Sequence, residues 1–174
     1  RKNVSVIHKN TNIHITPENS QCLLPRKWLN DEVVNVYLSL LKEREERDPE
    51  MFRRCHFFSS FFFVKLGIKG TGYDYRSVRR WTDPNRLGYN LLDCEMCFVP
   101  INRERHWSLG IINITEKKFQ YLDSLGRDDD DDGVLNLLAR YFVDEAKDKT
   151  GNEADVSRWK RQVVKRLPRQ ENGL

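Results

Sequence analysis

Apolar residues recur at helical spacing between residues 30 and 47, the most regular stretch of the chain. Positions 33, 36, 37, 40 and 41 are apolar and would share one face of a helix. Asn30 or Asp31 suits the N-cap, and Glu32 is favoured in the first turn. The pattern predicts a helix that begins at one of these two residues and ends before Pro49.

Two further apolar stretches predict helices, and a basic segment follows them. The run 57–66 contains two serines and ends before Gly67, which favours a buried helix over a strand. After Gly133, apolar residues line one side of a predicted helix: Val134, Leu135, Leu137, Leu138, Tyr141, Phe142 and Ala146. Residues 158–169 hold six basic side chains around apolar positions, which indicates a helix end followed by a strand.

Three segments have the pattern of β-strands, namely 95–101, 106–114 and 117–123. The last two are predicted to form a hairpin that turns over 113–116. A four-residue turn would place Ile112 opposite Lys117. His106 would then lie opposite Asp123, with both side chains on one face of the sheet. An odd-length turn would place them on opposite faces.

His106 and Asp123 are the first candidate for chemistry. An Asp that accepts a hydrogen bond from one imidazole nitrogen fixes the tautomer, and the other nitrogen can then face a nucleophile. A His and an Asp on neighbouring strands are two of the three members of such a triad, whose third member is a Cys or a Ser. A lone His before a Trp is more often a structural residue. The hypothesis of a catalytic role for His106 therefore depends on the paired Asp123.

The composition fits one folded domain. The chain has 174 residues, of which 39% are hydrophobic and 11% aromatic. The formal net charge of +4 suits an acidic protein partner as well as nucleic acid. No run of about 18 apolar residues predicts a membrane span, and no signal peptide opens the chain.

The cysteine pattern favours a reducing compartment, the cytosol or the nucleus. Cys22, Cys55, Cys94 and Cys97 do not have the spacing of a secreted disulfide framework. Cys94 and Cys97 form a lone C-x-x-C, and zinc would need a second pair of ligands, so no metal site is predicted. Cys97 also alternates with apolar positions, as a buried strand residue does.

A run of five aspartates, 128–132, precedes Gly133. It is either a site for a metal or basic partner, or a solvated loop at a helix N-terminus, where negative charge is favoured. The second interpretation is preferred, because calcium loops interleave their ligands with a Gly and end in a Glu.

Six segments together resemble the SUMO-specific (ubiquitin-like, sentrin-specific) cysteine protease family, whose fold is papain-like. They are Trp28–Asp31, Phe57–Phe63, Arg80–Thr82, Val99–Ile101 with His106–Leu109, Asp123–Gly126 and Gln170–Gly173. Within this family, the chain most resembles the plant and yeast-type deSUMOylating enzymes. The resemblance implies an α+β fold in which a mixed central sheet is flanked by helices, and it implies no cofactor.

The resemblance also implies roles for individual residues. His106 would be the general base and then the general acid, Asp123 would orient it, and Gln170 would donate to the oxyanion. Trp28 and Trp107 would form the walls of a narrow tunnel that admits a Gly-Gly tail, since residues with a Cβ would not pass.

Two further residues carry a substrate-binding role only by resemblance. Asp31 would meet a basic residue of the modifier, a role compatible with helix capping only if Asn30 is the cap. Phe58 would touch the modifier, although a place in the core explains it equally well.

The chain departs from the family pattern at the nucleophile. In the family, the segment that Gln170–Gly173 resembles is followed at once by Asp-Cys-Gly, and none of the four cysteines here aligns with that Cys. The resemblance implies that residues 1–174 are a single catalytic-type domain, truncated before the nucleophile helix. We expect these residues alone to be inactive and poorly stable, with apolar sheet surface uncovered. Hydrolysis of a SUMO–fluorophore conjugate by them would contradict this.

The implied function is a deSUMOylating isopeptidase and SUMO-precursor processing peptidase, which cleaves after Gly-Gly by a Cys-His-Asp mechanism. Its partners would be SUMO, or a related ubiquitin-like modifier, and SUMO-conjugated proteins. We expect a monomer that is located in the nucleus, or else at the nuclear envelope or in the cytosol. An alternative is a catalytically dead SUMO-binding module. Nucleic-acid binding is disfavoured, because five successive aspartates and no recognised motif speak against it.

Overall fold

The fold is built on a central sheet with the strand order β3-β6-β7-β8-β9. The computed structural model describes residues 6–9, 11–68, 72–103, 105–126 and 133–170. The central strands are β3 (Cys55–Phe57), β6 (Met96–Arg103), β7 (His106–Asn113), β8 (Lys118–Leu122) and β9 (Lys160–Val163). The two outer pairs are parallel and the two inner pairs antiparallel, so the sheet is mixed, as predicted.

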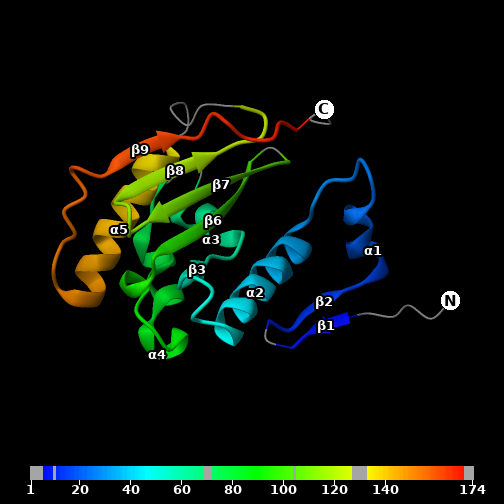
Figure 1. The fold of residues 1–174 in the computed structure, drawn as a ribbon, viewed down its shortest axis with the longest axis horizontal. Coiled ribbons are helices and arrows are strands. Elements are labelled where there is room, and N and C mark those ends of the chain that lie inside the picture. The colour runs from blue at the N-terminus through cyan, green and yellow to red at the C-terminus, as the bar shows by residue number, and fades with distance from the viewer. Residues whose placement is uncertain (1–5, 10, 69–71, 104, 127–132, 171–174) are drawn as a thin grey trace.

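Helices and two small strand pairs surround this sheet. The helices are α1 (Pro17–Ser20), α2 (Asp31–Arg47), α3 (Phe61–Leu66), α4 (Pro84–Leu87) and α5 (Val134–Thr150). The small pairs are β1 (Val6–His8) with β2 (Ile13–Ile15), and β4 (Gly67–Ile68) with β5 (Gly72–Tyr73). In Figure 1, α5 lies against β7 and β8, and α2 lies at the β3 end of the sheet.

Helix α5 forms the core together with the inner face of the sheet. Leu138 and Tyr141 are fully buried, as are Ile112 and Phe119 on the strands beneath them. A Cβ at Gly110 would lie 2.8 Å from Cδ1 of Leu138, so β7 and α5 approach closely at this glycine. The helix predicted after Gly133 is thus confirmed, and its apolar side faces the sheet.

Helix α2 has the bounds that its pattern predicts. The side chain of Asn30 accepts a hydrogen bond from the Val33 N–H at 3.0 Å, so Asn30 is the N-cap and Asp31 lies in the first turn. Such a cap typically stabilises a helix by about 1 kcal/mol. On the sheet face beside α2, Phe57, Phe98 and Leu109 line an apolar groove of about 320 Å³.

The prediction of one helix over 57–66 is wrong in its first part. Residues 55–57 form β3, and the helix α3 begins only at Phe61. Phe57 pairs with Phe98 of β6, their rings stack at 5.2 Å, and the next N–H donates to the Phe98 carbonyl at 2.9 Å. Pairing with a distant strand decides this segment, and a short apolar run carries no signal of it.

The helix end predicted at the start of 158–169 is also wrong. Helix α5 ends at Thr150, where Gly151 adopts the left-handed conformation (φ +77°), and the chain then turns back to β9. Trp159 lies in this return segment and stacks on Phe119 at 5.2 Å. The strand part of the prediction is confirmed.

The predicted hairpin exists, but its register differs by two residues. Asn113 pairs with Lys118, so the turn covers 114–117 rather than 113–116. Asn113 stays in the strand because its side chain accepts the Glu116 N–H at 2.9 Å and so closes the turn from within. A shift of two residues keeps every side chain on its predicted face.

The run of five aspartates, 128–132, lies outside the described residues. Within the described ranges, no helix is long and apolar enough to cross a membrane, and no group of three or more His, Cys, Asp or Glu side chains is placed to hold a metal ion.

Candidate active site

His106 and Asp123 meet at one end of the sheet. His106 is the first residue of β7, and Asp123 directly follows β8. Nε2 of the imidazole lies 2.7 Å from Oδ1 of the carboxylate, and the two side chains are 9% and 1% exposed. A buried pair at this distance is a charge-assisted hydrogen bond, which holds the ring in one orientation.

The carboxylate of Asp123 has two further donors. Its Oδ1 accepts the backbone N–H of Leu125 at 2.7 Å, and its Oδ2 accepts the Tyr121 hydroxyl at 3.2 Å. A buried carboxylate needs such partners to offset its lost hydration. Because all three donors converge on it, Asp123 is fixed before any substrate arrives.

The geometry decides which imidazole nitrogen is available for chemistry. Nε2 of His106 faces Asp123, so a neutral ring that donates to the carboxylate carries its proton there. Nδ1 then presents a lone pair. This arrangement can accept a proton from a nucleophile and later return it to a leaving group.

Gln170 is held beside this pair by Ser124. The Ser124 hydroxyl donates to Oε1 of Gln170 at 3.1 Å, and the Gln170 N–H donates to the Ser124 carbonyl at 3.0 Å. With its oxygen engaged, the Gln170 amide has its NH₂ group left as a donor, which is what an oxyanion requires.

A pocket of about 310 Å³ joins these groups to the two tryptophans. Its lining residues are Lys27, Trp28, Leu29, Arg105, His106, Trp107, Ser124 and Gln170. The indole N–H of Trp107 donates to the Leu29 carbonyl at 2.9 Å and so ties the extended segment before α2 to the sheet. Trp28 is 44% exposed, as a wall of an open pocket would be.

The other two predicted substrate-binding residues lie elsewhere. Asp31 is half-buried in the first turn of α2, and since Asn30 caps the helix, its carboxylate is not needed for capping. Phe58 is 2% exposed and stacks on Phe62 at 3.8 Å within the core. The structure therefore does not bring Phe58 to the pocket surface, and its burial favours the core alternative.

None of the four cysteines lines this pocket. Burial, with Glu45 and Glu95 nearby, raises the pKa of the Cys55 thiol to about 11, and burial raises that of Cys94 to about 12. Burial also raises the pKa of Cys97 well above its usual value. Thiols that stay protonated are poor nucleophiles, so these three cysteines are structural.

Sequence reasoning missed three residues around the site. Ser124, Leu125 and Tyr121 hold Gln170 and Asp123 in place, although Ser124 and Leu125 belong to a motif already singled out. The strand alternation that puts Tyr121 on the face of Asp123 was a usable signal.

Comparison with known proteins places the chain in a family. Residues 27–174 match the model of the Ulp1 protease family, C-terminal catalytic domain. The chain belongs to the Ulp1 protease family. The resemblance predicted from the six segments is thus confirmed, and the match begins next to Trp28 and includes all the pocket residues.

Relatives of the Ulp1 family share much of this sequence. The chain is 55% identical to ubiquitin-like-specific protease 1A of Arabidopsis thaliana over 99% of its own length and 34% of that protein. It is 37% identical to sentrin-specific protease 2 of Homo sapiens over 92% of its length and 26% of that protein. The chain thus spans about a third of the plant relative and a quarter of the human one.

Solved Ulp1 structures share the fold. The C-terminal Ulp1 protease domain in complex with Smt3, the yeast ortholog of SUMO, superposes with a TM-score of 0.76 at 29% identity. That match covers 99% of this chain and 71% of the solved one. The prediction of an α+β fold with a mixed central sheet is confirmed.

Proposed function

We propose that this chain carries the base, the orienting carboxylate and the oxyanion donor of a cysteine-type SUMO protease. The activity is maturation of the SUMO precursor and release of SUMO from target lysines. The observation that carries the proposal is that His106, held by Asp123, and Gln170, held by Ser124, line one pocket together with two indoles. Membership in the Ulp1 family supports it.

The reaction follows from the orientation of these groups. Nδ1 of His106 takes the proton of a cysteine thiol, and the thiolate attacks the carbonyl carbon of the last glycine of SUMO. The NH₂ group of Gln170 donates to the resulting oxyanion. His106 returns the proton to the leaving lysine amine, and water then hydrolyses the thioester.

The thiol comes from outside these 174 residues in this proposal. The four cysteines lie away from the pocket, and three of them have raised pKa values. A second solved structure, SUMO protease Ulp1 with its catalytic cysteine oxidised to a sulfenic acid, is matched by this chain over 67% of its length.

Substrate selection rests on the pocket walls. Trp28 and Trp107 both line the pocket beside His106, and a Gly-Gly tail is the peptide best suited to pass between two indoles. Asp31, half-buried at the start of α2, is assigned to a basic residue of the modifier. Phe58 is not assigned to the contact surface, because its side chain is in the core.

A hydrolysis assay tests the catalytic proposal. The product of the complete reading frame is incubated with a SUMO–fluorophore conjugate, as wild type and as His106→Ala or Asp123→Asn. We expect kcat to fall by about 10³–10⁴-fold in both variants. His14→Ala removes an exposed histidine and should leave the rate unchanged. Full activity of His106→Ala would disprove the role of this histidine.

The 174 residues alone suit a second candidate function, a SUMO-binding module, because the pocket is present without a thiol beside it. Titration with SUMO that ends in Gly-Gly, followed by tryptophan fluorescence, tests it. We expect saturable binding that is lost in Trp107→Ala and lost when SUMO ends one glycine earlier. Equal binding of both SUMO forms would rule out tail recognition at this pocket.

We further propose that the protein acts in the nucleus as a monomer. The four cysteines are all free, which suits a reducing compartment. Imaging of a fluorescent fusion of the complete product tests the location, and light scattering tests the oligomeric state. Retention in the secretory pathway would contradict the first part, and a stable dimer the second.

A further inference from the structure

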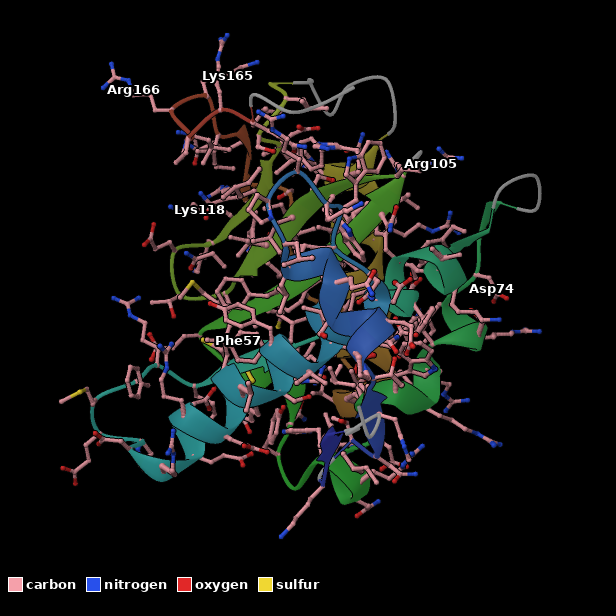
Figure 2. The ribbon with its side chains drawn as sticks, turned by 90° about the vertical axis from the view of Figure 1, so that its right-hand side faces the viewer. Phe57, Asp74, Arg105, Lys118, Lys165 and Arg166 are labelled. Carbon is pink, nitrogen blue, oxygen red and sulfur yellow. The ribbon has the colours of Figure 1, made fainter. Side chains whose placement is uncertain are left out.

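The segment that carries Trp28 has little packing to hold it. Residues 23–29 are all exposed, and they lead from α1 to α2 as a loop. Figures 1 and 2 both show α1 beside the N-terminal end of α2, with this loop above the two helices. Because an exposed loop has few buried apolar contacts, its position depends on the hydrogen bonds that fix it.

Asn30 fixes the end of this loop with both polar atoms of its side-chain amide. Its Oδ1 accepts the Val33 N–H at 3.0 Å and so caps α2. Its Nδ2 donates to the carbonyl of Asn19, in α1, at 2.9 Å. Asn30 and Asn19 are both half-buried. The second bond closes the chain from 19 to 30 into a ring and ties α1 to the start of α2.

This bond lies close to the pocket wall. Asn30 is two residues from Trp28, and the residue between them, Leu29, accepts the indole N–H of Trp107 through its carbonyl. Trp28, Leu29 and Trp107 all line the pocket of the candidate active site. Together, the bonds made by Asn30 and Trp107 set where the Trp28 indole lies in the pocket.

We propose that Asn30 is a positioning residue, whose bond to Asn19 places Trp28 and thereby sets how strictly the pocket selects a Gly-Gly tail. This inference rests on the proposed function. A wall that shifts outwards admits a tail residue with a Cβ, so the discrimination against alanine falls. The net strength of one half-buried hydrogen bond corresponds to about a fivefold change in an equilibrium, which is the size of the effect expected here.

Two substitutions at Asn30 separate the bond to α1 from the helix cap. Asp and Ser are both good N-caps, so Asn30→Asp and Asn30→Ser retain an acceptor for the Val33 N–H. Neither variant keeps the Nδ2 group that donates to Asn19. We therefore expect both variants to melt within about 2 °C of the wild type, because the cap is conserved.

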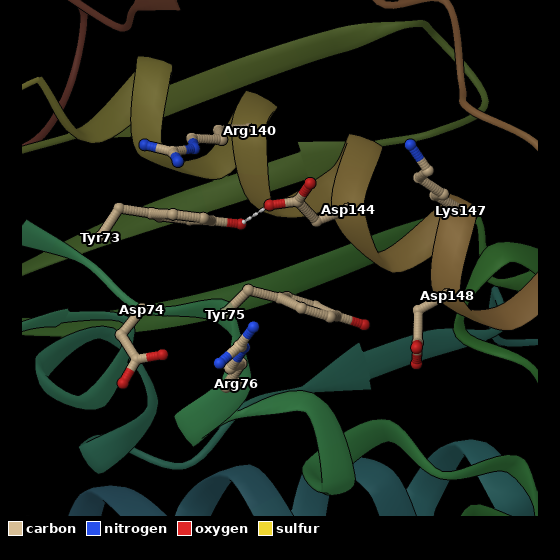
Figure 3. Close-up of a pocket in the computed structure, with 8 residues that line it drawn as sticks. All are labelled: Tyr73, Asp74, Tyr75, Arg76, Arg140, Asp144, Lys147 and Asp148. Atoms are coloured by element: carbon tan, nitrogen blue, oxygen red, sulfur yellow. Dashed lines mark hydrogen bonds between the residues drawn. The ribbon is translucent and has the colours of Figure 1, made fainter.

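Two control variants change comparable bonds away from the pocket. Asn90 caps the short helix that follows it with its side-chain oxygen, so Asn90→Ser changes a cap of the same kind. Tyr73→Phe removes the hydrogen bond from Tyr73 to Asp144, which is 2.5 Å long and lies in the charged cavity shown in Figure 3. Both residues of that bond are half-buried, as are those of the bond under test.

A spectroscopic assay tests the position of Trp28 without catalysis. The product of the complete reading frame is labelled with 5-fluorotryptophan, and Trp28→Phe identifies the fluorine NMR line of Trp28. We expect Asn30→Asp and Asn30→Ser to change the width of this line, which reports motion of the indole, and the two control variants to leave it as it is. A line of wild-type width in both Asn30 variants would overturn the inference.

A kinetic assay links this position to tail selectivity. The same product is given SUMO–fluorophore conjugates whose tail ends in Gly-Gly or in Gly-Ala. We expect both Asn30 variants to raise KM for the Gly-Gly conjugate about three- to fivefold with kcat within about twofold of the wild type. The ratio of kcat/KM between the two conjugates should fall about fivefold. The control variants should keep the wild-type values.

The outcomes of this assay separate the inference from the proposed function. An unchanged ratio in both Asn30 variants, with the fluorophore still released, would overturn the inference alone. An equal loss on both conjugates through kcat would also overturn it, because it would show a general structural role for Asn30. Absence of release from the Gly-Gly conjugate by the wild type would instead overturn the proposed function.

Discussion

Ser124 and Gln170 are joined by two hydrogen bonds, one from the Ser124 hydroxyl at 3.1 Å and one from the Gln170 N–H at 3.0 Å. The pair forms a closed ring that fixes both the backbone and the amide of Gln170. Ser124 also directly follows Asp123, so one short segment sets the positions of the carboxylate and of the oxyanion donor.

Removal of the Ser124 hydroxyl should therefore affect catalysis through Gln170. In the product of the complete reading frame, we expect Ser124→Ala to lower kcat about three- to tenfold with little change in KM, against about 10²–10³-fold for Gln170→Ala. Steady-state kinetics on a SUMO–fluorophore conjugate measure both. Ser124→Thr retains the hydroxyl and should restore most of the rate; a Thr variant as slow as the Ala variant would contradict the positioning role.

Thiol labelling should separate Cys22 from the other cysteines. Cys22 is half-buried in the turn before α2, whereas Cys55, Cys94 and Cys97 are at most 7% exposed and have raised pKa values. We expect a maleimide at pH 7 to label the native chain once, at Cys22, and four times after denaturation. Intact mass and peptide mapping give the answer, and the variant Cys22→Ser should remain unlabelled. Rapid native labelling of Cys55 would contradict the structure.

Mild acid should destabilise the fold through His56. Burial, with Lys42 nearby, lowers the pKa of His56 from 6.5 to about 3 in the folded chain. Its stabilising contribution is complete above pH 6.5 and is lost as the pH falls towards 3, because only the unfolded chain then takes up the proton. The loss is about 1.4 kcal/mol per pH unit.

Urea denaturation between pH 7 and pH 4.5 measures this dependence. His56→Gln should flatten the slope by the equivalent of one proton, whereas the same change at the exposed His14 should leave it as it is. A wild-type slope that His56→Gln does not alter would show that His56 is not the titrating group.

Gly110→Ala should strain the contact between β7 and α5. The added Cβ would lie 2.8 Å from Cδ1 of Leu138, which is fully buried and has little room to move. Overpacking of this kind costs about 1–3 kcal/mol, so we expect Tm to fall by roughly 3–10 °C. Gly67→Ala meets its neighbours only at 3.5 Å or more and is the matched control. A Gly110→Ala variant that melts with the wild type would contradict the close approach.

The parts of the fold that the sequence predicted are those specified by local signals. Helix α2 follows from its apolar stripe and the Asn30 cap, and α5 from its own stripe. Strand β3 depends instead on contacts with distant residues, such as that between Phe57 and Phe98. The register of the hairpin depends on one side-chain contact within the turn, between Asn113 and the Glu116 N–H. Local periodicity contains no information about such partners.

In the candidate active site too, some features could be predicted from local patterns and others could not. That His106 and Asp123 share a face was predictable, because strand alternation constrains which residues do so. Their predicted place directly opposite each other was wrong, because the observed register is shifted by two residues. The hydrogen-bonded ring that Ser124 makes with Gln170 was not predictable. These residues are 46 positions apart, and only the parallel pairing of β9 with β8 brings them together. The buried place of Phe58 likewise follows from packing against α5, which its motif does not reveal.

The turn at 114–117 sets a rule for changing the length of this hairpin. If one residue were inserted and the turn kept its four-residue form, the pairing would slip by one position. Every side chain of β8 would then change face, and Asp123 would move away from His106. Two inserted residues would restore the side and move the carboxylate only along the strand. Insertions that keep the four-residue form of the turn should therefore be tolerated only in steps of two, and a library of such insertions selected for activity should show that parity.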